Sequence, residues 1–194
     1  MFQTCTALST SPKLKAATLV KNCYTEMFSG CSVLNEITMI GRSIPNNSLT
    51  NWVSGVAGSG DFYGYVTTTL SEGVSGIPVG WVDRNECYVE AIADGTLSFS
   101  GSGLQYSKNW DDWTSDGIAS IAVSAGDIVR FKGVRNGGAI SSTGDFKVGG
   151  NILSLAANDY TSVTTGVFEA VFKNATKLVS AFDLVLPTEL QAGC

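Results

Sequence analysis

The polar residues best suited to bind a ligand gather in one loop, residues 109–117 (NWDDWTSDG). Its carboxylates Asp111, Asp112 and Asp116 are the oxygen ligands that Ca²⁺ prefers. Their spacing does not match an EF-hand, and turns rich in Asp and Gly often connect strands. These residues predict either a calcium site formed by the three carboxylates or an ordinary turn that binds no metal.

Large aromatic residues lie in and beside the same loop. Their rings offer stacking area for a sugar, and the neighbouring polar side chains offer hydrogen bonds. The alternative is that at least one tryptophan is buried, as large aromatic side chains usually are. The predicted glycan contacts are Tyr106, Asn109, Trp110, Asp111 and Trp113.

Catalytic patterns are weak throughout the sequence. Asp111 and Asp112 are adjacent, so on a strand they would point to opposite faces and could not act as an acid and base pair. The chain has no His to serve as a base, and no Gly-x-Ser-x-Gly elbow. We predict a protein that is not an enzyme and needs no cofactor.

Charge and hydropathy argue against two classes of partner. The 12 basic and 17 acidic residues give a net charge of −5 without a basic run, which disfavours nucleic acid. No apolar stretch approaches the ~20 residues of a membrane span, so we expect no membrane insertion. The first residues also lack the charged head and apolar core of an export signal.

A short pattern recurs along the chain. Residues 1–8 (MFQTCTAL) return about 26 residues later as residues 27–34 (MFSGCSVL), a spacing typical of leucine-rich solenoid repeats. A weaker copy, residues 171–178 (VFKNATKL), has Ala in place of Cys. Short helix-compatible pieces such as 23–28 alternate with strand-compatible ones such as 34–39.

Cysteine placement follows the same pattern. Cys5, Cys23, Cys31 and Cys194 occupy repeat positions, and only Cys87 lies elsewhere. Equivalent positions of stacked repeats lie above one another, so small buried thiols explain the spacing, with disulfides as the alternative.

Four regions follow from these patterns. Residues 1–52 contain the repeats, and residues 53–82 form a cap or linker that covers their open edge. Residues 83–150 alternate like the strands of a small β-sandwich, with Asp94-Gly95 as a hairpin turn. Residues 151–194 hold a transition and a partial repeat. The predicted class is mixed and β-rich, with leucine-rich-repeat-like solenoid segments flanking a small antiparallel β-sandwich.

Three segments together carry a resemblance to a known family. They are residues 23–34 (CYTEMFSGCSVL), 49–62 (LTNWVSGVAGSGDF) and 76–81 (GIPVGW), and they resemble BspA-type leucine-rich repeats. Such repeats occur in surface proteins of gut anaerobes and in virion proteins of their phages. The likeness covers about residues 1–82 and 166–194. Compared with those relatives the segment order is changed, as in a circular permutation or a window across tandem copies.

The resemblance implies a structural or adhesive phage virion component, such as a tail or head fibre, assembled in the host cytoplasm. The alternative is a secreted or surface-bound bacterial adhesin or carbohydrate-binding module. Expected partners are further copies of the chain or other virion proteins, and a glycan or protein receptor on the host surface. Because a solenoid repeat cannot bury its apolar face alone, the two chain ends should dock, within one chain or between chains. The residues expected in that interface are Phe2, Leu8, Phe172, Leu178 and Leu190.

Overall fold

The computed structural model describes the whole chain except residues 17, 42, 65–69, 158–165 and 188–194. The chain forms two compact units, an N-terminal unit (Met1–Asn85) and a C-terminal unit (Glu86–Cys194). Strands dominate both units, and the one regular helix of the described residues is the short 3-10 helix η1 (Ile152–Leu155). The predicted β-rich class is therefore confirmed.

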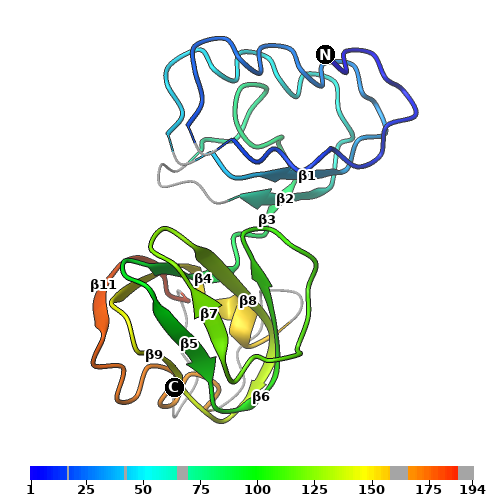
Figure 1. The fold of residues 1–194 in the computed structure, drawn as a ribbon. Coiled ribbons are helices and arrows are strands. Elements are labelled where there is room, and N and C mark those ends of the chain that lie inside the picture. Colours follow the sequence, from blue (N-terminus) through cyan, green and yellow to red (C-terminus); the bar gives the residue numbers. More distant parts are fainter. Residues whose placement is uncertain (17, 42, 65–69, 158–165, 188–194) are drawn as a thin grey trace. The chain divides into compact units, whose positions relative to one another are not determined.

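The N-terminal unit is organised around a parallel sheet in the order β1-β2-β3 (Figure 1). Its strands are β1 (Glu36–Met39), β2 (Asp61–Gly64) and the two-residue β3 (Val82–Asp83). Isolated parallel bridges, such as the one between Thr10 and Glu36, add the first segment of the chain beside β1. Each sheet position is therefore reached again after 26, 25 and then 21 residues along the chain, as Thr10, Glu36, Asp61 and Val82 show.

Successive segments also stack where they turn. The predicted helical piece 23–28 is wrong, because every fourth residue of this turn is left-handed and interrupts a helix: Asn22, Glu26 and Gly30 have positive φ. The next turn repeats this geometry at Asn47, Asn51 and Gly55. Glycine suits the third position, since a Cβ on Gly30 would lie 3.1 Å from the Thr4 methyl group.

Backbone hydrogen bonds join one turn to the next. The N–H of Phe28 donates to Trp52 O at 2.8 Å, and that of Phe2 donates to Met27 O at 2.9 Å. The rings of these turns are in contact: Phe2 stacks on Phe28 with centroids 5.7 Å apart, and Phe28 lies tilted against Trp52 with centroids 6.0 Å apart. The N–H donors at alternate positions thus all point toward the following turn.

The C-terminal unit contains two sheets. One has the order β11-β10-β4-β8-β6 and the other the order β7-β5-β9, and all pairs are antiparallel except β10 with β11. Both sheets supply the buried core, which includes Val89, Phe131, Leu97 and Ile140. The strands are β4 (Cys87–Ala91), β5 (Gly95–Phe99), β6 (Ser102–Lys108), β7 (Ile121–Val123), β8 (Ile128–Asn136), β9 (Ile140–Ser142), β10 (Phe146–Asn151) and β11 (Leu178–Val185).

The segment before β11 has the backbone geometry of the turns in the other unit. Gly166, Ala170 and Asn174 have positive φ at the same four-residue spacing. Six backbone hydrogen bonds run from N–H to carbonyl between residues 169 and 166, 171 and 168, 173 and 170, 175 and 172, 176 and 174, and 178 and 175. Each has a counterpart in the N-terminal unit, between residues 25 and 22, 27 and 24, 29 and 26, 31 and 28, 32 and 30, and 34 and 31. We call residues 22–34 the second turn and residues 166–178 the C-terminal turn.

Candidate functional site

A buried arginine organises the aromatic loop of the C-terminal unit. The Arg130 guanidinium, from β8, lies 3.7 Å from the ring centroid of Trp110 and 4.8 Å from that of Trp113. Its Nη1 donates to Glu86 Oε2 at 3.0 Å, and its Nη2 donates to Ser107 Oγ at 3.1 Å. The group therefore combines a buried ion pair with cation–π stacking.

Burial dominates the electrostatics of this cluster. It raises the pKa of Glu86 above its ordinary value, although the neighbouring Arg130 opposes the change. Burial likewise lowers the pKa of Lys132, whose Nζ lies 4.3 Å from the Trp113 ring centroid. Charged forms are costly here unless they are paired, so the cluster suits a structural role.

The structure brings the predicted sugar-binding aromatics together in a different arrangement. Trp110 is only 2% exposed and is stacked on Arg130, so no sugar ring can reach it. The Tyr106 hydroxyl donates to the carbonyl of Asp116 at 3.0 Å, which closes the loop. Trp113 keeps a partly exposed ring, and Asp111 is exposed.

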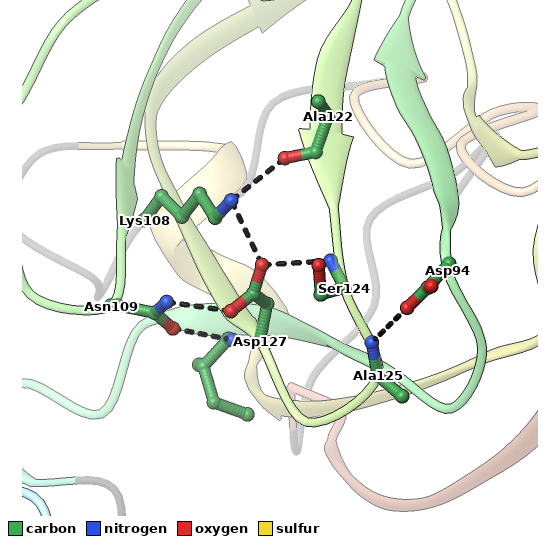
Figure 2. A network of polar contacts seen from close by, with 8 residues as sticks. Asp94, Lys108, Asn109, Ala122, Ser124, Ala125 and Asp127 are labelled. Carbon is green, nitrogen blue, oxygen red and sulfur yellow. Dashed lines mark hydrogen bonds and ion pairs between the residues drawn. The ribbon is translucent and has the colours of Figure 1, made fainter.

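Asn109, the remaining predicted glycan contact, belongs to a polar network around Asp127 (Figure 2). Its Nδ2 donates to Asp127 Oδ1 at 2.7 Å, and its Oδ1 accepts from the N–H of Ile128 at 2.9 Å. Asp127 Oδ2 accepts from Lys108 Nζ and from the N–H of Ser124, both at 2.8 Å. One carboxylate therefore joins the end of β6 to the turn between β7 and β8.

These bonds set the ionisation of Asp127. Burial by itself would raise its pKa, but the hydrogen bonds from Lys108, Ser124 and Asn109 outweigh burial and lower it below the ordinary value. Asp94 holds the same turn by accepting from the N–H of Ala125 at 2.9 Å. The network therefore holds the turn between β7 and β8 in place, and both polar atoms of the Asn109 side chain are used for bonds within the protein.

The carboxylates predicted to bind calcium do not converge. Asp111, Asp112 and Asp116 are exposed. Among the described residues, no group of three His, Cys, Asp or Glu side chains is placed to hold a metal ion, and these three carboxylates are no exception. Across all the residues that the structure describes, no helix is long and apolar enough to span a membrane.

A second buried arginine was missed by the sequence reasoning. Arg135, also from β8, donates from Nη2 to Glu169 O at 2.7 Å and to Gly138 O, and from Nη1 to Val167 O. It is 6% exposed and lines a cavity of about 520 Å³ beside the C-terminal turn. Arg135 follows Val134 near the end of a strand that also contains Arg130 and Lys132, so nothing in the sequence set it apart or indicated these partners.

The predicted docking residues lie in both units. Phe2 and Leu8 are partly buried against the core of the N-terminal unit. Phe172 and Leu178 are partly buried against the core of the C-terminal unit. Leu190 falls outside the described residues.

Comparison with known proteins adds no relative: no family model, curated protein or solved structure matches the chain.

Proposed function

We propose that the chain is a non-enzymatic structural and adhesive protein, specifically a phage virion component such as a tail or head fibre or another appendage. It would serve assembly and attachment to the host surface. In this proposal the N-terminal unit is a leucine-rich-repeat-like solenoid and the C-terminal unit is a small β-sandwich.

The observation that carries the proposal is the stack of parallel segments in the N-terminal unit. Glu36 pairs with Asp61, and Asp61 pairs with Val82, so equivalent residues follow one another across the sheet. The turns stack in the same order through their backbone N–H groups. An architecture of this kind grows by adding similar segments at an open end, which suits a protein that works as part of an assembly.

Two further observations support a structural role. The edge strand β11 exposes apolar side chains, with Phe182 93% and Val179 55% accessible. An exposed apolar edge is a common site of strand addition. The cysteines of the described residues, Cys5, Cys23, Cys31 and Cys87, are all free thiols, which suits assembly in a reducing cytoplasm.

Virions purified on a density gradient from the culture that carries the gene provide the test. Mass spectrometry should find the chain in the particle fraction, and an antibody against it should label an appendage in electron micrographs. Recovery of the chain on bacterial cells or in particle-free medium would overturn the virion assignment and favour the bacterial adhesin.

A further inference from the structure

The C-terminal turn has two sides, and the described residues of its unit form backbone hydrogen bonds with only one of them. In the N-terminal unit, the carbonyls of residues 48, 50, 52 and 54 accept N–H groups from the preceding turn. The equivalent carbonyls in the C-terminal turn belong to Val167, Glu169, Val171 and Lys173. Arg135 donates to the first two of these, and the N–H of Ile140 donates to Val171 O at 2.8 Å. Strand β8 and the start of β9 thus take the place of a preceding turn.

The other side of the C-terminal turn carries donors. In the second turn, the N–H groups of residues 24, 26, 28 and 30 all donate to the next turn, at 2.7 to 3.0 Å. Their equivalents are Phe168, Ala170, Phe172 and Asn174. Among the described residues, none of these four N–H groups donates a backbone hydrogen bond. Beside them, β11 is the edge strand of its sheet. A following turn could accept hydrogen bonds from these four N–H groups and pair with the backbone edge of β11.

The first turn of the chain, residues 1–8, offers the matching acceptors. Met27 O and Ser29 O of the second turn accept from Phe2 and Thr4. The equivalent carbonyls of the first turn, Met1 O and Gln3 O, receive no backbone N–H from the described residues. Gln3 O accepts from the Thr4 hydroxyl at 2.7 Å, and as a carbonyl oxygen it has a second lone pair for an N–H group. The acceptors at the start of one stack therefore complement the donors at the end of another.

We infer that the C-terminal turn and β11 of one copy bind the N-terminal segment of a second copy, residues 1–16, as the next turn of a continuous stack. The inference rests on the proposed assembly role and names the partner as another copy of this chain. Phe172 N–H would donate to Met1 O of the second copy, and Asn174 N–H to Gln3 O. Phe172 would also lie beside the second copy's Phe2 and extend the row of aromatic rings in contact.

Such a contact joins two different surfaces. A head-to-tail interface produces a ring if its rotation closes and a filament if it does not. The exposed apolar side chains of β11 then lie against a neighbour. The inference thus accounts for an apolar edge that would otherwise promote unspecific pairing.

A cysteine placed in the C-terminal turn tests this contact. When the turns are aligned, Ala175 occupies the same position in the C-terminal turn as Cys5 in the first turn and Cys31 in the second. Adjacent strands lie about 4.8 Å apart, within the ~4.4–6.8 Å that a disulfide requires between Cα atoms. Oxidised glutathione should therefore link Ala175→Cys chains through Cys5 of the neighbouring copy. Ala125→Cys, on an exposed turn of the same unit, is the matched control.

The expected result is a ladder of covalent oligomers for Ala175→Cys, with the bond to Cys5 identified by peptide mass spectrometry. The ladder should be at least about tenfold weaker for Ala125→Cys, and Cys5→Ser should abolish it. Equal linkage in both variants, or a bond of position 175 to another cysteine, would overturn the inference. So would absence of linkage when circular dichroism shows a folded chain. The particle experiment above is independent of this result, so the chain could still prove to be a virion protein without this contact.

Discussion

Arg135 gives the sharpest test of how the C-terminal turn is held. Its guanidinium makes three hydrogen bonds to carbonyl oxygens, two of them on this turn. A hydrogen bond with a charged partner contributes about 1.5–3 kcal/mol, and an acceptor left buried without a donor adds a further cost. Arg135→Met keeps much of the side-chain length and removes every donor. We expect it to lower the free energy of unfolding by about 3–5 kcal/mol.

Urea denaturation of the full chain, followed by tryptophan fluorescence, measures this loss. Hydrogen exchange of residues 166–178 shows whether the loss lies in the C-terminal turn, where protection should fall first. Arg135→Lys should lose about half as much, because an ammonium group keeps the charge but cannot span several carbonyls as a planar fork does. Lys147→Met removes an exposed cation from the same unit and should be nearly neutral. A change below about 1 kcal/mol for Arg135→Met, with unaltered exchange, would refute the proposed clamp.

Three further outcomes follow from the buried and paired groups. Because its hydrogen bonds lower the pKa of Asp127 in the fold, the stability it contributes is present above the unfolded pKa of about 3.9 and is lost as pH falls through the folded value. Acid titration of Asp127→Asn should therefore show a shallower loss below about pH 4 than the wild type. Burial raises the pKa of Glu86 in the fold. The stability that this group contributes is therefore present below its unfolded pKa of about 4.3 and is lost as pH rises through the folded pKa. Glu86→Gln should remove that decline, and an unchanged pH profile would contradict the assignment. Burial raises the pKa of Cys87 to about 12, so a thiol reagent at neutral pH should modify it only after unfolding, whereas exposed Cys5 should react in the folded chain.

Local patterns in the sequence predicted many strands well. The alternation in residues 87–92 and 128–134 corresponds to β4 and β8, and the strand-compatible piece 34–39 contains β1. Period-two alternation is a local property, so it can be recognised before any long-range contact is known. The helix expected at 23–28 is not formed because the left-handed residues Asn22, Glu26 and Gly30 interrupt it. Glycine and asparagine favour this conformation but also occur outside it, and Glu26 gives no sign of it in the sequence.

The candidate sites could not be predicted in the same way. Trp110 and Trp113 suggest an open aromatic platform until Arg130, from a strand about 20 residues away, is placed against both rings. Arg135 similarly meets Val167 and Glu169 across more than 30 residues of chain. Such pairings depend on strand order and register, which local patterns do not encode.

The central claim is that one copy of the chain continues the stack of another. The most direct measurement is the mass of the full chain in solution, by light scattering across a dilution series with reductant present. We predict oligomers that dissociate on dilution. Phe2→Asp should shift the series toward monomer, and circular dichroism checks that the variant is still folded, because Phe2 also packs on Phe28 of its own chain. A wild-type chain that remains monomeric from low to high micromolar concentration would contradict the account.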